Sequence, residues 1–123
     1  MFKLICEKPQ RIIKNKDRLE KILGIKIVNR GREVIIHGSA ENEYIAEKVV
    51  EALDFGFPFS VALLIKEQDF MLEFLSIKNY TKRKDLERVR ARIIGKDGKT
   101  LKTLHGLTKC YFEIKDNQVG IVG

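Results

Sequence analysis

The sequence is poor in the residues that usually build metal and disulfide sites. Its 123 residues include only two cysteines, two histidines and two prolines, and no tryptophan. Cys6 and Cys110 lie far apart and form no CxxC pair, so we expect reduced thiols in apolar strands. His37 and His105 belong to no cluster of ligand residues. We therefore predict that the protein binds no metal and no cofactor.

Long hydrophobic runs are also missing. No apolar run approaches the ~20 residues that cross a bilayer, and the first residues lack the apolar core of a signal peptide. The hydrophobic fraction is still 44%, with seven Phe and three Tyr, which is enough to build a core. A chain of this length forms one domain or two very small ones. We predict a folded, cytoplasmic protein.

Negative charge is scarce in one part of the chain. The sequence has 24 Lys and Arg against 17 Asp and Glu, a net charge of +7. Between positions 78 and 109 the only acidic residues are Asp85, Glu87 and Asp97. The basic residues of that segment are Lys78, Lys82, Arg83, Lys84, Arg88, Arg90, Arg92, Lys96, Lys99, Lys102 and Lys109. Their excess is larger than the net charge of the whole chain, which favours a nucleic-acid partner over an ordinary solvated face.

A Gly-x-x-Gly turn stands at the centre of this basic segment. It reads Gly95-Lys96-Asp97-Gly98, with a helical apolar pattern before it and a second helix-forming run from Lys99. Glycine has no Cβ, so such a turn takes positive φ and lets another molecule approach its backbone. A lysine inside the turn and a helix N-terminus behind it suit a phosphate group.

Two observations argue against catalysis. The Gly98-Lys99-Thr100 run resembles the end of a nucleotide-binding P-loop, but that motif needs a glycine where this chain has Ile93. The sequence also offers no Ser/His/Asp grouping and no pair of carboxylates placed for acid–base chemistry. We predict that the protein is not an enzyme.

The apolar pattern predicts two similar halves of short helices and strands. In the first half we expect strands over 2–6, 25–28 and 33–37, and helices from 9, over 18–23 and over 39–53. In the second half we expect three helices: one over 59–65, one that ends at 94, and one over 99–106. We expect strands over 70–77, 109–114 and 119–122. The strongest break is 54–58. It predicts domains 1–56 and 57–123.

The halves repeat each other. Ile12-Ile13 corresponds to Ile93-Ile94, and Leu23 corresponds to Leu104. With its glycine turn, the chain resembles two tandem type I KH domains, each in the order β-α-α-β-β-α. The resemblance implies an α+β fold in which each module is a three-stranded antiparallel sheet with helices packed on one face. The second module would lack its last helix.

More narrowly, the chain resembles the archaeal and eukaryotic Krr/Pno/Dim group of ribosome-assembly proteins. In that group the first KH-like domain lacks the glycine loop and the second keeps it. Here Lys14-Asn15-Lys16-Asp17 stands at the first loop position. The resemblance implies binding of single-stranded small-subunit ribosomal RNA near its 3′ end during rRNA processing. It also implies work with a Nob-type endonuclease and other assembly factors.

Two other classes stay open. One is a general KH protein that acts on messenger RNA or in RNA decay, and the other is a protein-interaction scaffold with a basic surface. The first half has a basic strip that would either widen the RNA footprint or dock the second domain; it is formed by Lys8, Arg11, Lys14, Lys16 and Arg18. We favour a mainly architectural and protein-binding role for that half.

The predicted RNA site surrounds the glycine turn. Basic side chains would hold the phosphate backbone, apolar side chains would lie under the bases, and a strand edge would offer amides and carbonyls to the base edges. The candidate RNA-binding residues are Arg88, Ala91, Arg92, Ile94, Gly95, Lys96, Asp97, Gly98, Lys99, Leu101, Lys102, Cys110, Tyr111 and Phe112.

Overall fold

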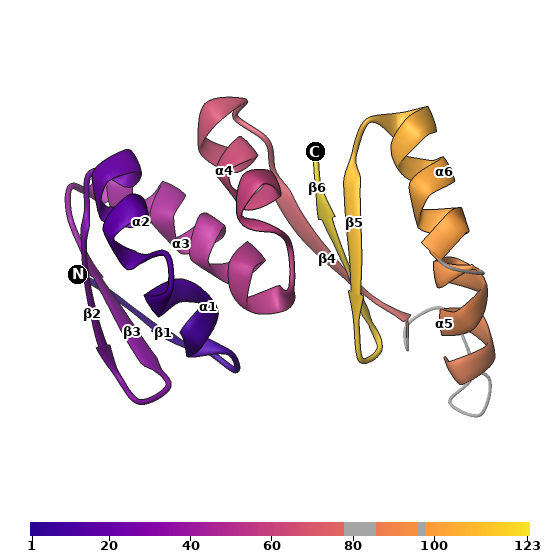
Figure 1. The fold of residues 1–123 in the computed structure, drawn as a ribbon, viewed down its shortest axis with the longest axis horizontal. Coiled ribbons are helices and arrows are strands. Elements are labelled where there is room, and N and C mark those ends of the chain that lie inside the picture. Colours follow the sequence, from indigo (N-terminus) through magenta and orange to yellow (C-terminus); the bar gives the residue numbers. More distant parts are fainter. Residues whose placement is uncertain (78–85, 96–97) are drawn as a thin grey trace. The chain divides into compact units, whose positions relative to one another are not determined.

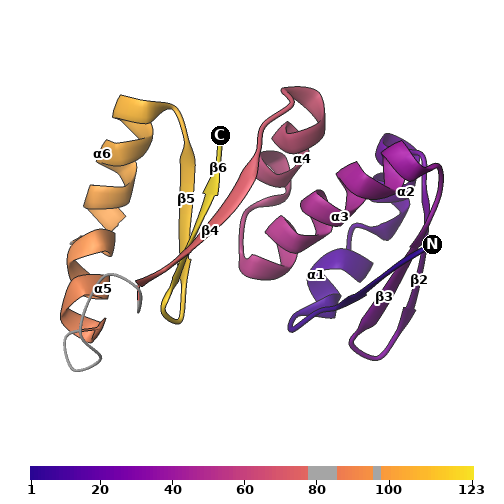
Figure 2. The same cartoon turned by 180° about the vertical axis from the view of Figure 1, so that it is seen from behind.

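The computed structural model describes residues 1–77, 86–95 and 98–123 of the chain. These residues form two compact units, which we call unit 1 (Met1–Asp69) and unit 2 (Phe70–Gly123). Each unit contains a three-stranded antiparallel sheet with helices beside it (Figures 1 and 2). The α+β class expected from the sequence is confirmed.

Unit 1 follows the predicted order of elements closely. The elements are β1 (Phe2–Ile5), α1 (Pro9–Ile13), α2 (Lys16–Leu23), β2 (Lys26–Arg30), β3 (Glu33–His37), α3 (Ala40–Phe55) and α4 (Phe59–Glu67). The sheet has the order β1-β3-β2, with both neighbours antiparallel to the central strand. Helices α1, α2 and α3 lie on one face of this sheet in both views (Figures 1 and 2).

Local signals in the sequence set several helix ends in unit 1. The Ser39 hydroxyl accepts a hydrogen bond from the Asn42 amide at 3.2 Å and so caps the N-terminus of α3. Gly24 ends α2 in the left-handed conformation with φ of 66°, which glycine adopts at low cost. Serine at an N-cap and glycine after a helix C-terminus are typical of these positions.

The core of unit 1 lies between its sheet and its helices. Ile36 of β3 is fully buried and is paired with Phe2 on one side and Ile27 on the other. Helices contribute the opposing apolar side chains at helical spacing. The largest fully buried side chains of this unit are Ile12, Leu19, Ile27, Val34, Ile36, Val49, Val50, Leu53 and Phe57.

Unit 2 repeats the sheet of unit 1. Its elements are β4 (Leu72–Ser76), α5 (Leu86–Ile94), α6 (Lys99–Thr108), β5 (Tyr111–Lys115) and β6 (Gln118–Val122). The sheet order is β4-β6-β5, again with an antiparallel central strand formed by the third strand in sequence. Helices α5 and α6 pack on each other, and α6 lies beside the edge strand β5 (Figure 1).

The division between the units differs from the boundary that the sequence predicted. The break at 54–58 suggested that residues from 57 onward start the second domain, whereas the compact unit 1 extends to Asp69. Helix α4 therefore belongs to unit 1, because it packs on α3. The turn after Phe55 reverses the chain without leaving the unit. The sequence also indicates a polar turn over 79–82, which lies outside the described residues.

Candidate nucleic-acid interface

Two glycines shape the turn between α5 and α6. Gly95 has φ of +72° and Gly98 has φ of +71°, both in the left-handed region. The Gly95 amide donates a hydrogen bond to the Ala91 carbonyl at 2.9 Å, which ends α5. A Cβ placed on Gly95 would collide with the Thr100 side chain and come within 2.8 Å of the Thr100 amide nitrogen. The first glycine is required by both backbone conformation and space.

The N-terminus of α6 has no side-chain cap. Gly98 occupies the cap position and has no side chain to accept a hydrogen bond from the first-turn amides. The first turn also contains no acidic residue. These amides and the positive end of the helix dipole form a favourable place for an anion.

Exposed cationic side chains flank the turn on both helices. Arg88 and Arg92 are four residues apart on α5, so they lie on one face of that helix. Lys99 and Lys102 are three residues apart on α6. All four are solvent-exposed, and within residues 1–77, 86–95 and 98–123 none of them forms an ion pair with a carboxylate. Their charge is therefore open to an external polyanion.

The apolar side chains next to the turn are only partly buried. Ile94 and Leu101 are half-buried and Ala91 is exposed. Helix α6 has no buried residue along its length. Partial exposure leaves the Ile94 and Leu101 side chains accessible to an external molecule.

The strand edge next to α6 agrees with the prediction only in part. Strand β5 is an edge strand, so Tyr111 and Phe112 lie where alternate backbone groups point away from the sheet. Cys110, however, precedes the strand. Its amide donates to the Thr108 hydroxyl at 3.1 Å and its carbonyl oxygen lies 2.9 Å from the His105 Nδ1 atom. The expected free amide and carbonyl at Cys110 are already engaged.

His105 contributes to this region although no sequence pattern selects it. Its Nδ1 atom contacts the Cys110 carbonyl, and its ring lies 4.3 Å from the Tyr111 ring, measured between centroids. These contacts join the end of α6 to the start of β5. They also place one face of Tyr111 against His105. Only the structure reveals this role, because the partners of the histidine lie outside its own helix.

Two candidate residues, Lys96 and Asp97, lie outside the described residues. Across the described ranges, no three His, Cys, Asp or Glu side chains gather as metal ligands. Over the same part of the chain, no helix combines the length and apolar character needed to cross a membrane. The candidate site combines backbone amides and cationic side chains with the apolar side chains of Ala91, Ile94 and Leu101.

Comparison with known families agrees with this geometry. The eukaryotic-type KH-domain family (KH-domain type I) matches residues 71–123, which include α5, the glycine turn, α6 and β5. Residues 71–123 of the chain thus match a type I KH domain. KH domains are non-catalytic modules that bind single-stranded nucleic acid through a Gly-x-x-Gly loop. The resemblance predicted from the glycine turn is confirmed.

A longer protein of the same kind is similar over most of the chain. A KH domain-containing protein of Methanocaldococcus jannaschii is 30% identical over 115 residues, which represent 88% of this chain and 51% of that protein. The chain thus spans about half the length of this relative. The similarity includes both units and is not limited to the KH domain of unit 2.

Solved structures share the fold of the whole chain. A protein of unknown function from Aeropyrum pernix has 26% identity and a TM-score of 0.87, over 99% of this chain and 72% of its own. Dim2p from Pyrococcus horikoshii has 24% identity and a TM-score of 0.87, and the match covers 99% of this chain and 80% of Dim2p. A chain in the a/eIF2alpha–aDim2p–rRNA complex from the same organism has 23% identity and a TM-score of 0.87. This match covers 99% of the present chain and 75% of the chain in the complex.

Proposed function

We propose that this protein binds single-stranded small-subunit ribosomal RNA, near its 3′ end, during ribosome assembly. The observation that carries the proposal is the Gly95 to Gly98 turn, which leads into an uncapped helix N-terminus between two pairs of exposed cations. The turn would hold the phosphate backbone, and the half-buried Ile94 and Leu101 would contact the bases. Such a groove holds about four nucleotides.

We further propose that the chain is a pair of KH-type modules, residues 1–69 and 70–123. Both units share an antiparallel sheet whose central strand is the third in sequence, which supports a common origin. Only unit 2 has the glycine turn, so the main RNA contact is assigned to it. The ribosomal target is supported by the shared fold with Dim2p and with a chain of an rRNA complex. A cytoplasmic location and a Nob-type endonuclease partner stay predictions.

The RNA-binding step is tested by changing one charge at the turn. Lys96→Asp keeps both glycines and places a second acid beside Asp97, so the turn would repel phosphate. In a fluorescence anisotropy titration with labelled single-stranded RNA, we expect the affinity to fall at least about tenfold. The matched control is Lys3→Asp, because Lys3 is an exposed lysine on β1 of the other unit. Equal affinities for Lys96→Asp and the unchanged chain would overturn the turn as the binding site.

The ribosomal target needs a separate measurement. RNA crosslinked to the protein in cells should be sequenced, and we expect the reads to concentrate on small-subunit ribosomal RNA. Reads spread over messenger RNAs would favour a general KH protein instead. Loss of all crosslinking, with binding to an acidic protein retained, would favour a protein-interaction scaffold.

A further inference from the structure

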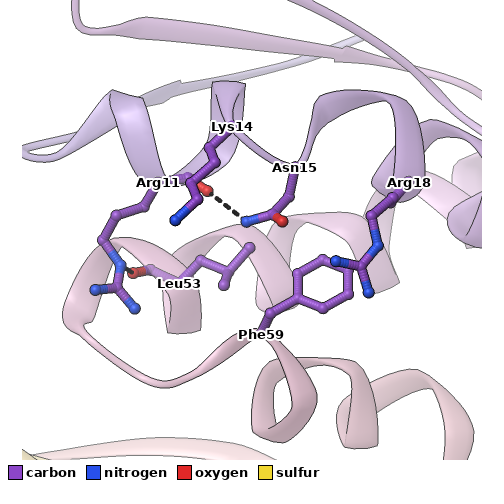
Figure 3. A pocket seen from close by; sticks show the side chains of 6 residues that line it. All are labelled: Arg11, Lys14, Asn15, Arg18, Leu53 and Phe59. Carbon is purple, nitrogen blue, oxygen red and sulfur yellow. Dashed lines mark hydrogen bonds between the residues drawn. The ribbon is translucent and has the colours of Figure 1, made fainter.

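A basic cavity lies within unit 1. It has a volume of about 330 Å³ and opens where the α1–α2 turn faces the junction of α3 and α4. Figure 3 shows the side chains that line it, which come from these helices and from the α1–α2 turn. They are Arg11, Lys14, Asn15, Arg18, Leu53 and Phe59.

Arg11 is held in place by the end of α3. Its Nε atom donates to the Leu53 carbonyl at 2.7 Å, and its Nη2 atom donates to the Phe57 carbonyl at 2.8 Å. The last carbonyls of a helix have no partner within the helix, so the bond to Leu53 satisfies a group that needs a donor. A guanidinium carries five N–H groups. Arg11 therefore reaches the cavity already oriented and with donors to spare.

The other polar side chains meet around an apolar floor. The Arg18 guanidinium lies over the Phe59 ring, 4.2 Å from its centroid. Asn15 donates a hydrogen bond from Nδ2 to the Arg11 carbonyl at 3.0 Å. This bond does not use the side-chain oxygen of Asn15. Lys14 is exposed at the mouth of the cavity. Leu53 and Phe59 lie beneath these groups in Figure 3.

The cations of the cavity are not paired with carboxylates within the part of the chain that the structure describes. None of the lining residues is acidic, and Arg11, Lys14 and Arg18 form no ion pair there. The nearby Asp54 carboxylate instead accepts the backbone amides of Glu7 and Lys8 at 3.1 and 2.7 Å. Like charges that share a cavity repel each other, so binding an anion would lower their electrostatic energy.

We propose that this cavity binds a phosphodiester group of single-stranded RNA. The phosphate would lie between Arg11, Lys14 and Arg18, and the attached sugar or base would contact Leu53 and Phe59. Guanidinium groups match phosphate geometry, and an aromatic ring next to them suits a nucleotide more than a carboxylate side chain. The volume suits one small ligand. RNA held by the KH domain of the same chain would also be at high local concentration.

The cavity is not a second copy of the predicted KH groove. That groove would lie between a helix pair and a strand edge, whereas no strand residue lines this cavity. The proposal rests on RNA binding as the function of the chain, but it assigns a separate contact to unit 1. It also revises the expectation that unit 1 has a mainly architectural role.

The test uses Lys14→Gln in the full chain, with Lys3→Gln as the matched control. Both residues are exposed lysines of unit 1, but only Lys14 lines the cavity. Affinity for a labelled single-stranded RNA about twelve nucleotides long would be measured between about 50 and 200 mM KCl. We expect Lys14→Gln to weaken binding several-fold and to reduce the slope of log affinity against log salt by about 0.7. We expect Lys3→Gln to change neither.

The outcomes separate this proposal from the function of the KH domain. If Lys96→Asp weakens binding while Lys14→Gln and Arg18→Gln leave affinity and slope unchanged, the cavity proposal is overturned and the KH function stands. If the unchanged chain binds no RNA, both are overturned. If Lys14→Gln loses binding to polyglutamate but keeps its RNA affinity, the cavity is a site for an acidic protein and the proposal is wrong. Circular dichroism of each variant checks its fold.

Discussion

Gly95 and Gly98 both have positive φ, but their surroundings differ. Added at Gly95, a Cβ would meet Thr100, whereas added at Gly98 it would meet no atom of the described residues within 4 Å. A non-glycine residue in the left-handed region costs about 1–2 kcal/mol for its backbone alone. Gly95 therefore carries a steric requirement in addition to the conformational one.

This difference predicts an order of stability for two variants. Gly98→Ala should lower the free energy of unfolding of unit 2 by about 1 kcal/mol, and Gly95→Ala should lower it by clearly more. Urea unfolding followed by circular dichroism and by a probe in unit 2 measures both values. Equal losses would show that Thr100 does not confine Gly95.

The two cysteines are predicted to differ in reactivity. Cys6 is 2% exposed, and burial raises its pKa to about 11, with Asp54 and Glu51 adding to the shift. Cys110, in contrast, is only half-buried. At pH 8 iodoacetamide should modify Cys110 first, because only the thiolate reacts. Mass spectrometry of the labelled peptides measures the order, and faster labelling of Cys6 would contradict it.

The raised pKa of Cys6 makes the stability of the fold depend on pH. A folded-state pKa above the unfolded value means that the native state favours the protonated thiol. The contribution of Cys6 is therefore complete below the unfolded pKa and is lost as pH rises from about 9 towards 11. The variant Cys6→Ala should lose less stability than the unchanged chain over this range in urea titrations. Identical pH profiles would rule out Cys6 as the source.

At the scale of elements, local chemistry predicted most helices and strands. Ser39 and Gly24 mark helix ends, and the apolar pattern located β3 at 33–37. The assignment of α4 could not be predicted, because a break in the sequence does not show which neighbour the next helix packs on. The structure shows that α4 packs on α3. Tertiary contacts, rather than the Phe55 to Pro58 turn, decide where unit 1 ends.

The extent of unit 1 makes a prediction for fragments. Residues 1–69 should fold cooperatively, because they include the helix that packs on α3. Residues 1–56 should be much less stable, since they leave the apolar face of α3 uncovered and remove Phe57, which is 1% exposed. Thermal unfolding of both fragments measures the difference. Equal stability of the two fragments would support the domain boundary after Gly56 that the sequence predicts.

At the scale of the whole molecule, charge and one motif predicted where the candidate site lies. The excess of Lys and Arg between positions 78 and 109 and the two glycines of the motif both indicate the α5–α6 turn. The sequence does not reveal the hydrogen bonds of the Cys110 backbone or the ring contact between His105 and Tyr111. Nor could the basic cavity of unit 1, because its lining residues are up to 48 positions apart, from Arg11 to Phe59.

Binding of single-stranded RNA at the glycine turn of unit 2 is central to all of these proposals. An NMR titration of the ¹⁵N-labelled full chain with a single-stranded RNA oligonucleotide tests it most directly. We predict shifts of the amide signals of Gly95, Gly98 and Lys99 that saturate with RNA and weaken as salt is raised. Amide signals at these residues that stay unchanged while RNA binds elsewhere, or does not bind at all, would contradict this assignment.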